Sequence, residues 1–235
     1  MQYRALATDY DGTLATHGVV DQETVRALEL FTGSGRILIM ATGRELSDLK
    51  RVFPHLGLFA RVVAENGALL YDPVQDRQTL LSGGASPVFV AELRRRGVPI
   101  SVGRAVVATV ELHERAVREA IENTGIPLSL SMNKGSIMVL PSEVSKATGL
   151  RKALVELGIT EDAVVGIGDA ENDIEFLEAC GCGVAVANAL PVVKSRAQLV
   201  TRGANGAGVV EVIHHLLRTG CLPCDRSVSE FFVPE

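Results

Sequence analysis

The sequence predicts an α/β protein in which a doubly wound parallel sheet carries a small inserted α+β domain. Short apolar runs, such as residues 36–40, alternate with helical segments over most of the chain, as is typical of strands buried on both faces of a parallel sheet. Between residues 82 and 141 the pattern changes to helix, hairpin, helix, hairpin, which makes a small open sheet with helices on one face. The alternating part is therefore expected to be Rossmann-like, with its strand ends sharing one crevice.

The elements of the main domain follow from apolar runs and from turn and cap signals. Asp21 is expected to cap a helix that presents Val25, Leu28 and Phe31 on one face. Asn66-Gly67 predicts a two-residue hairpin turn. The expected strands are residues 3–8, 36–40, 61–65, 68–71, 163–168, 183–187 and 198–201, and the expected helices include 45–53, 146–157 and 207–218.

The insert begins at a linker, Ser-Gly-Gly-Ala-Ser-Pro, over residues 82–87. Its helices are expected at 88–96 and 114–123, and its strands at 100–102, 106–110, 128–132 and 137–140. The domain organisation predicted from this change is a discontinuous core at 1–81 and 142–219, an insert at 82–141 and a tail at 220–235.

Composition excludes some classes of partner. The net charge is −5 with no basic stripe, aromatic residues are 4% of the chain and tryptophan is absent, so a nucleic-acid partner is not favoured. No export leader and no apolar run of about 20 residues is present, so a membrane span is not expected. The chain is predicted to be a cytoplasmic protein, either a monomer or a homodimer.

Four cysteines occupy the second half of the chain, Cys180, Cys182, Cys221 and Cys224. Their C-x-C and C-x-x-C spacings are compatible in principle with a zinc site. However, Cys182 opens an apolar strand, where cysteine usually packs as a small hydrophobic residue. A disulfide between Cys221 and Cys224 is disfavoured in a reducing cytosol.

Two carboxylates one residue apart end the first strand, in the stretch Asp9-Tyr10-Asp11-Gly12-Thr13. Carboxylates are costly to bury unless they are paired or hold a cation, so their position indicates a reaction centre with a metal. An Asp-Gly turn whose acids only cap the backbone explains the pentapeptide equally well when it is taken alone.

Other polar residues fall at the remaining strand ends or at the helix starts beside them: Thr42, Lys146, Asp169 and Asp173. Since these ends share one crevice, the acids would repel one another unless a hard cation bound there. Mg²⁺ fits best because it prefers oxygen ligands and binds substrate phosphate.

Thr42-Gly43 offers a hydroxyl and a backbone N–H to an anion, although Thr42 could instead be a plain N-cap. Lys146 stands at a helix start, where the helix dipole disfavours a cation. A phosphate or carboxylate partner explains that position, and a solvated surface lysine is the alternative.

Together these residues predict phosphoryl transfer. Asp9 would attack phosphorus and form an aspartyl-phosphate, and Asp11 would protonate the leaving oxygen and then activate water. Mg²⁺, Lys146, Thr42 and the Gly43 N–H would stabilise the charge on the transferred group.

The chain resembles the haloacid dehalogenase (HAD) superfamily of phosphohydrolases over roughly residues 1–215. Four motifs carry the resemblance, in order: Asp9-Tyr10-Asp11-Gly12-Thr13, Thr42-Gly43-Arg44, Lys146, and Gly168-Asp169-Ala170-Glu171-Asn172-Asp173. The insert, which follows Glu65-Asn66-Gly67-Ala68, resembles the type IIB cap of Cof-like phosphatases. In plan the chain is similar to phosphoglycolate and sugar-phosphate phosphatases.

The resemblance implies roles for individual residues. Mg²⁺ would be held by the Asp9 carboxylate, the Asp11 main-chain carbonyl, Asp169 and, through water, Asp173. Asn172 would orient phosphate or metal, and Thr42, Gly43, Arg44 and Lys146 would bind the phosphate or substrate. The substrate would be a small phosphorylated metabolite. In the cap, Arg104 and the turn Asn133-Lys134-Gly135 are candidates for contacting the leaving group, unless they are only solvated hairpin tips.

Two alternatives to a phosphatase remain at this point. A sugar phosphomutase also carries this type of cap, but it must hold a second phosphate, which calls for clustered cap arginines. The other alternative is a non-catalytic binding or regulatory domain on the same scaffold, because fold does not imply function.

Overall fold

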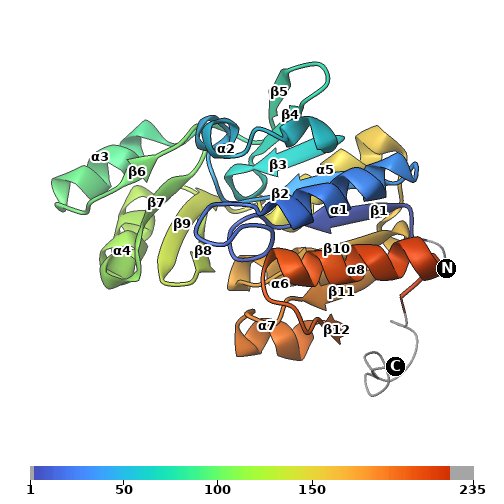
Figure 1. Cartoon of the computed structure of the whole chain (residues 1–235). Coiled ribbons are helices and arrows are strands. Elements are labelled where there is room, and N and C mark those ends of the chain that lie inside the picture. Colours follow the sequence, from blue (N-terminus) through green and yellow to red (C-terminus); the bar gives the residue numbers. More distant parts are fainter. Residues whose placement is uncertain (1–2, 223–235) are drawn as a thin grey trace.

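The computed structural model describes residues 3–222. Its larger sheet is parallel through six strands and ends in two antiparallel ones (Figure 1). In spatial order the strands are β12 (Leu199–Val200), β11 (Cys182–Ala185), β10 (Val164–Gly168), β1 (Ala5–Thr8), β2 (Ile37–Ala41), β3 (Arg61–Ala64), β4 (Leu69–Asp72) and β5 (Arg77–Leu80). This arrangement confirms the predicted α/β class.

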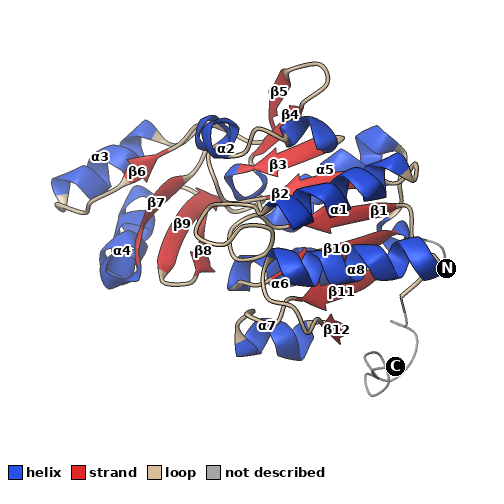
Figure 2. Cartoon of the chain, viewed as in Figure 1, coloured by secondary structure: helices blue, strands red, loops and turns tan. Residues whose placement is uncertain are grey.

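Helices cover both faces of this sheet (Figure 2). On one face α1 (Gln22–Gly33) packs against α8 (Gly206–Thr219), and on the other α5 (Lys146–Leu157) packs against α6 (Ile174–Ala179). The short helices α2 (Leu46–Val52) and α7 (Pro191–Arg196) follow β2 and β11. Asp21 caps α1 as expected, because its Oδ1 accepts a hydrogen bond from the Thr24 N–H at 2.8 Å.

A second, antiparallel sheet lies beyond the strand ends of the first (Figure 1). Its strand order is β6 (Ser101–Val102), β7 (Val107–Val110), β9 (Ser136–Pro141), β8 (Leu128–Asn133). Helices α3 (Pro87–Arg95) and α4 (Glu114–Thr124) pack together on one face of it, over Ile137 and Val139. The other face turns Met138 and Leu140 toward the core domain. This alternation along β9 follows from the two-residue period of a strand.

Two details differ from the expectation. Strand β5 was not predicted, because Arg77–Leu80 is a largely exposed edge strand without an apolar face. The hairpin between β3 and β4 forms, but its loop spans residues 65–68, since Ala64 pairs with Leu69. Asn66 adopts a left-handed φ of 54° inside that loop, so the expected two-residue turn was wrong.

Within residues 3–222, none of the helices has the length and apolar character that a membrane span requires. Cys221 is a free thiol, so it forms no disulfide with Cys224, which lies outside residues 3–222 together with most of the predicted tail. Cys182 is buried at the start of β11, as expected. The domain boundaries drawn from the sequence stay a prediction.

Candidate active site

Asp9 follows β1 directly and is buried. Its Oδ1 accepts a hydrogen bond from the Lys146 ammonium at 2.6 Å, and the same ammonium donates to Asp173 Oδ1 at 2.6 Å. Lys146, at the start of α5, is only 1% exposed, so the alternative of a solvated lysine was wrong. Burial by itself lowers the pKa of Lys146, but Asp173 and Asp9 outweigh it and raise that pKa. The lysine therefore stays charged between the two carboxylates.

Asp173 also organises the loop after β10. Its Oδ2 accepts hydrogen bonds from the N–H groups of Asp169 (2.8 Å) and Ala170 (2.9 Å). Both carboxylate oxygens of Asp173 are thus bound to protein groups. The loop conformation that presents Asp169 consequently depends on Asp173.

Asp169 is fully buried, and it is held from two sides. Its Oδ1 accepts a hydrogen bond from the Thr13 hydroxyl at 2.8 Å, and its Oδ2 pairs with the ammonium of Lys134 in the cap. Gly12 makes room for this carboxylate, because a Cβ at residue 12 would lie 2.3 Å from Asp169 Oδ2. Gly12 also has a φ of 83°, in the region that favours glycine.

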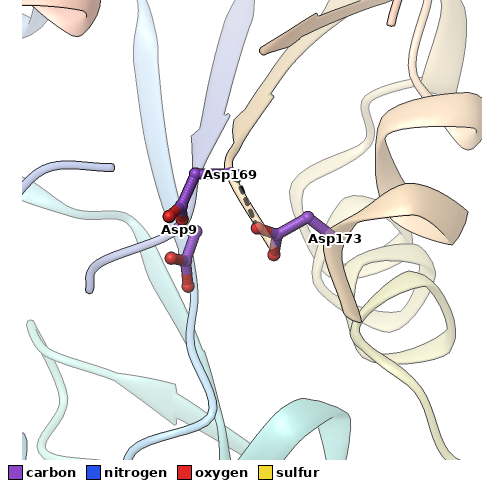
Figure 3. A group of neighbouring side chains, drawn as sticks. All are labelled: Asp9, Asp169 and Asp173. Carbon is purple, nitrogen blue, oxygen red and sulfur yellow. Dashed lines mark hydrogen bonds between the residues drawn. The ribbon is translucent and has the colours of Figure 1, made fainter. Parts of the chain in front are cut away.

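Figure 3 shows how Asp9, Asp169 and Asp173 converge from two neighbouring strand ends and the start of the following helix. One carboxylate oxygen from each lies within 4.8 Å of the other two. Burial raises the pKa of Asp9 well above its ordinary value, and Asp173 and Asp169 add to the rise while Lys146 opposes it. Burial also raises the pKa of Asp169. The three carboxylates share only two ammonium groups, and hard oxygen donors with a net negative charge fit a divalent cation, so the cluster is a candidate metal site.

Hydrogen-bond donors suited to an anion follow β1 and β2, which are neighbouring strands of the sheet. Thr42 is buried, and its hydroxyl accepts a hydrogen bond from the Arg44 N–H at 3.1 Å, which leaves the hydroxyl proton for another acceptor. Within residues 3–222 no protein group accepts a hydrogen bond from the N–H of Asp11 or of Gly43. The arrangement offers donors to a tetrahedral oxyanion beside a carboxylate.

Arg44 was expected to contact phosphate, and in the structure it contacts two carboxylates. Its guanidinium binds both oxygens of Asp11, at 2.6 and 2.7 Å, and also pairs with Asp48. It lies over the Tyr10 ring, with 5.3 Å between Cζ and the ring centroid. In this structure Arg44 therefore orients the Asp11 carboxylate.

Asn172 links the site to the cap. Its Nδ2 donates to Asn66 Oδ1 at 2.9 Å, and Asn66 donates in turn to the Ser131 hydroxyl in β8 at 3.0 Å. Asn172 Oδ1 is buried and has no hydrogen-bond partner within the described part of the chain. An unpaired buried acceptor of this kind is usually satisfied by a ligand or water.

Sequence reasoning missed the role of Glu65. This buried carboxylate, with φ 48°, accepts hydrogen bonds from the N–H groups of Ala105 (2.8 Å) and Val106 (3.3 Å) in the cap. Gly103 lets it approach, because a Cβ there would lie 2.8 Å from Glu65 Oε2. The only sequence signal was the position of an acid at the end of β3, and it gave no hint of the partner.

Two cavities border the site. One of about 540 Å³ is lined by hydroxyl, amide and acidic groups, including Ser131, Glu143 and Asn172. The other, of about 380 Å³, is lined by residues that include Asp11 and Lys134. Arg104, proposed from the sequence to face a leaving group, instead hydrogen-bonds Gln78 at 2.7 Å on an exposed edge.

A Rossmann-like core with buried carboxylates at its strand ends, covered by an inserted sheet, is the architecture of a capped Rossmann-like hydrolase. The chain belongs to the haloacid dehalogenase-like hydrolases, whose family model matches residues 6–94 and 104–213. It is 32% identical over 224 residues to a phosphoglycolate phosphatase of Methanothermobacter thermautotrophicus, covering 91% of this chain and 99% of that one.

Solved structures agree with the assignment of fold. The HAD subclass IIB sugar phosphatase BT4131 superposes with a TM-score of 0.75 at 20% identity, over 91% of this chain and 98% of that one. The sucrose-phosphatase from Synechocystis gives a TM-score of 0.72 at 19% identity, over 92% and 98%. The expected class, a HAD-like phosphoric monoester hydrolase with a type IIB cap, is therefore confirmed.

Proposed function

We propose that this protein hydrolyses a small phosphomonoester, such as phosphoglycolate or a sugar phosphate, with Mg²⁺ as its cofactor. The observation that carries the proposal is the contact of Lys146 with Asp9 at 2.6 Å, which fixes a buried carboxylate at the end of β1, and the unused donors described above follow β1 and its neighbour β2. The similar proteins support this substrate class, since they include a phosphoglycolate phosphatase and sugar phosphatases.

In the first step an Asp9 oxygen attacks phosphorus, and the bond from phosphorus to the leaving oxygen breaks. Asp11 gives its proton to that oxygen, so the leaving group departs as a neutral alcohol. In the second step water attacks the aspartyl-phosphate and gives its proton to Asp11. Phosphate leaves, and Asp9 returns as a carboxylate.

The surrounding groups have separate tasks in this scheme. Lys146, the Thr42 hydroxyl and the Gly43 N–H bind the phosphoryl oxygens and orient them for in-line attack. Asp9, the Asp11 carbonyl, Asp169 and, through water, Asp173 would hold Mg²⁺. When bound, the ion would neutralise negative charge on the phosphoryl group.

A phosphomutase finds little support. It needs cations in the cap to hold a second phosphate, yet the arginines at positions 95, 96, 115 and 118 of the cap form ion pairs with glutamates of α3 and α4. These helices cover the face of the cap sheet that is turned away from the core domain. The pairs are Arg95 and Arg96 with Glu92, Arg96 and Arg115 with Glu119, and Arg118 with Glu114.

The test is phosphate release from a panel that contains phosphoglycolate and hexose phosphates, with Mg²⁺ and then with a chelator. Hydrolysis of at least one of these esters is expected, together with its loss in the chelator and in Asp9→Asn. Absence of hydrolysis over the whole panel, or an active Asp9→Asn variant, would overturn the proposal. Dependence on a bisphosphorylated activator would favour the mutase.

A further inference from the structure

Lys134 brings a positive charge from the cap to the loop after β10, which contains Asp169. It lies in the turn between β8 and β9, and its N–H donates to Glu171 Oε2 at 3.1 Å. Its ammonium pairs with Asp169 and lies 3.0 Å from the position that a Cβ of Gly12 would take. Among residues 3–222, Lys134 is the one lysine or arginine that lines either cavity beside the site.

The smaller cavity is the one that a leaving group would enter. A proton donor must lie within hydrogen-bond reach of the leaving oxygen, and Asp11 lines only this cavity of the two. Its other walls include the amides of Asn133, Asn188 and Asn205 and no second carboxylate. The larger cavity contains Glu143, Glu171 and Glu175, which disfavour an anion.

Lys134 and a divalent cation would compete for one carboxylate. Asp169 is a member of the acidic cluster that fits the metal, and like charges on one buried carboxylate repel strongly. The lysine side chain is 37% exposed and flexible, while its main chain stays bound to Glu171. With the cation in place, the ammonium would therefore turn into the cavity that contains Asp11.

We propose that Lys134 binds a carboxylate on the leaving group, so that the preferred substrates are phosphomonoesters of small hydroxy acids. This inference rests on the proposed phosphatase function. One side chain of the cap, Lys134, would then determine whether the protein prefers an anionic or a neutral leaving group. A charge-assisted hydrogen bond between ammonium and carboxylate provides the recognition.

The test compares phosphoglycolate with 2-hydroxyethyl phosphate, which has the same two-carbon skeleton without the carboxylate. The wild-type protein is expected to show a higher kcat/KM for phosphoglycolate. Lys134→Met should reduce the ratio of the two kcat/KM values about 10- to 100-fold, the usual effect of losing a hydrogen bond between charged groups. Lys134→Arg, which keeps the charge, should retain part of the preference. Lys152→Met, which removes an exposed lysine of α5, is the control and should leave the ratio unchanged.

A second readout needs no turnover. Lys134→Met removes the competing ammonium. The variant should therefore bind Mg²⁺ several-fold more tightly than the wild type when the affinity is measured by calorimetry without substrate. Equal kcat/KM values in the wild type, equal losses on both esters in Lys134→Met, or unchanged Mg²⁺ affinity would each overturn the inference while the phosphatase function stood. Absence of hydrolysis of every phosphomonoester would instead remove the proposed function on which it rests.

Discussion

Arg44 holds Asp11 by a two-pronged contact, from Nε to Oδ2 at 2.6 Å and from Nη2 to Oδ1 at 2.7 Å. Asp11 lies on the loop after β1, whereas Arg44 follows β2. The pair therefore links neighbouring strand ends and fixes the plane of the carboxylate that is proposed to move the proton. Lysine cannot reproduce this planar fork.

Arg44→Lys should consequently impair proton transfer to the leaving group. We expect kcat/KM, which reports only the steps up to departure of the leaving group, to fall about 10- to 100-fold for an alkyl phosphate such as phosphoglycolate, part of the usual contribution of general acid catalysis. p-Nitrophenyl phosphate should lose much less, because its leaving group departs without a proton. Steady-state kinetics on both esters measure the difference. Arg51→Lys, at an exposed partner of Asp48, is the matched control, and equal losses on both esters would contradict the expectation.

Lys146→Met should destabilise the fold. The substitution leaves the buried carboxylates of Asp9 and Asp173 without their shared cation, and breaking a buried ion pair from one side costs about 3–5 kcal/mol. Urea unfolding in the presence of a chelator measures the free energy of unfolding. Lys152→Met should change it little, and an equally small change in Lys146→Met would show that the two acids need no lysine.

Gly12→Ala should abolish metal binding by displacing Asp169. A Cβ at residue 12 would meet Asp169 Oδ2 at 2.3 Å, which is far inside van der Waals contact. Gly35 has nearly the same φ, 82° against 83°, but a Cβ there meets nothing within 4 Å. Gly35→Ala therefore isolates the backbone strain from the clash. Calorimetric titration with Mg²⁺ should give binding in Gly35→Ala and none in Gly12→Ala, and the same affinity in both would refute this account.

The stability of the protein without bound metal should fall as pH rises through the raised pKa of Asp9. Burial raises that pKa, so above the ordinary value the folded protein keeps a proton that the unfolded chain has released. In that range the unfolding free energy decreases with pH, by up to about 1.4 kcal/mol per pH unit. Asp9→Asn cannot titrate and should lack this decrease.

Thermal unfolding with a chelator, from about pH 4 to pH 8, would measure this linkage. The Tm of Asp9→Asn should exceed that of the wild type by a margin that grows with pH and then levels off. Adding Mg²⁺, which binds the ionised carboxylates, should narrow the margin. A margin that does not change with pH would mean that the Asp9 carboxyl has an ordinary pKa in the folded protein.

The sequence predicted those parts of the fold and site that depend on local pattern. The apolar runs located every core strand except β5, an edge strand whose positions are mostly exposed. The positions of Asp9, Lys146, Asp169 and Asp173 at strand ends and helix starts were enough to predict that they meet, because carboxyl ends of parallel strands share an edge. All four lie together in the structure.

What the sequence could not predict depends on how the cap docks. Lys134 reaches Asp169, and Glu65 reaches the amides of Ala105 and Val106. These contacts join residues 35 to 41 positions apart and follow from the orientation of one sheet over another. No spacing rule encodes that orientation. The contact of Arg44 with Asp11 was not predicted for a related reason, since a motif arginine beside a phosphate site has two acceptors within reach and the sequence does not choose between them.

Glu65 has a consequence for the exchange of caps among related enzymes. It binds the cap only through main-chain N–H groups, which almost any sequence supplies, and the turn it meets needs little more than the small residue at Gly103. The Glu65 contact is therefore indifferent to the cap's side chains, whereas Lys134 acts on Asp169 through its side chain. A cap grafted from a relative would keep this main-chain anchor and yet bring a different substrate preference, so that one part of cap docking can be retained while selectivity diverges.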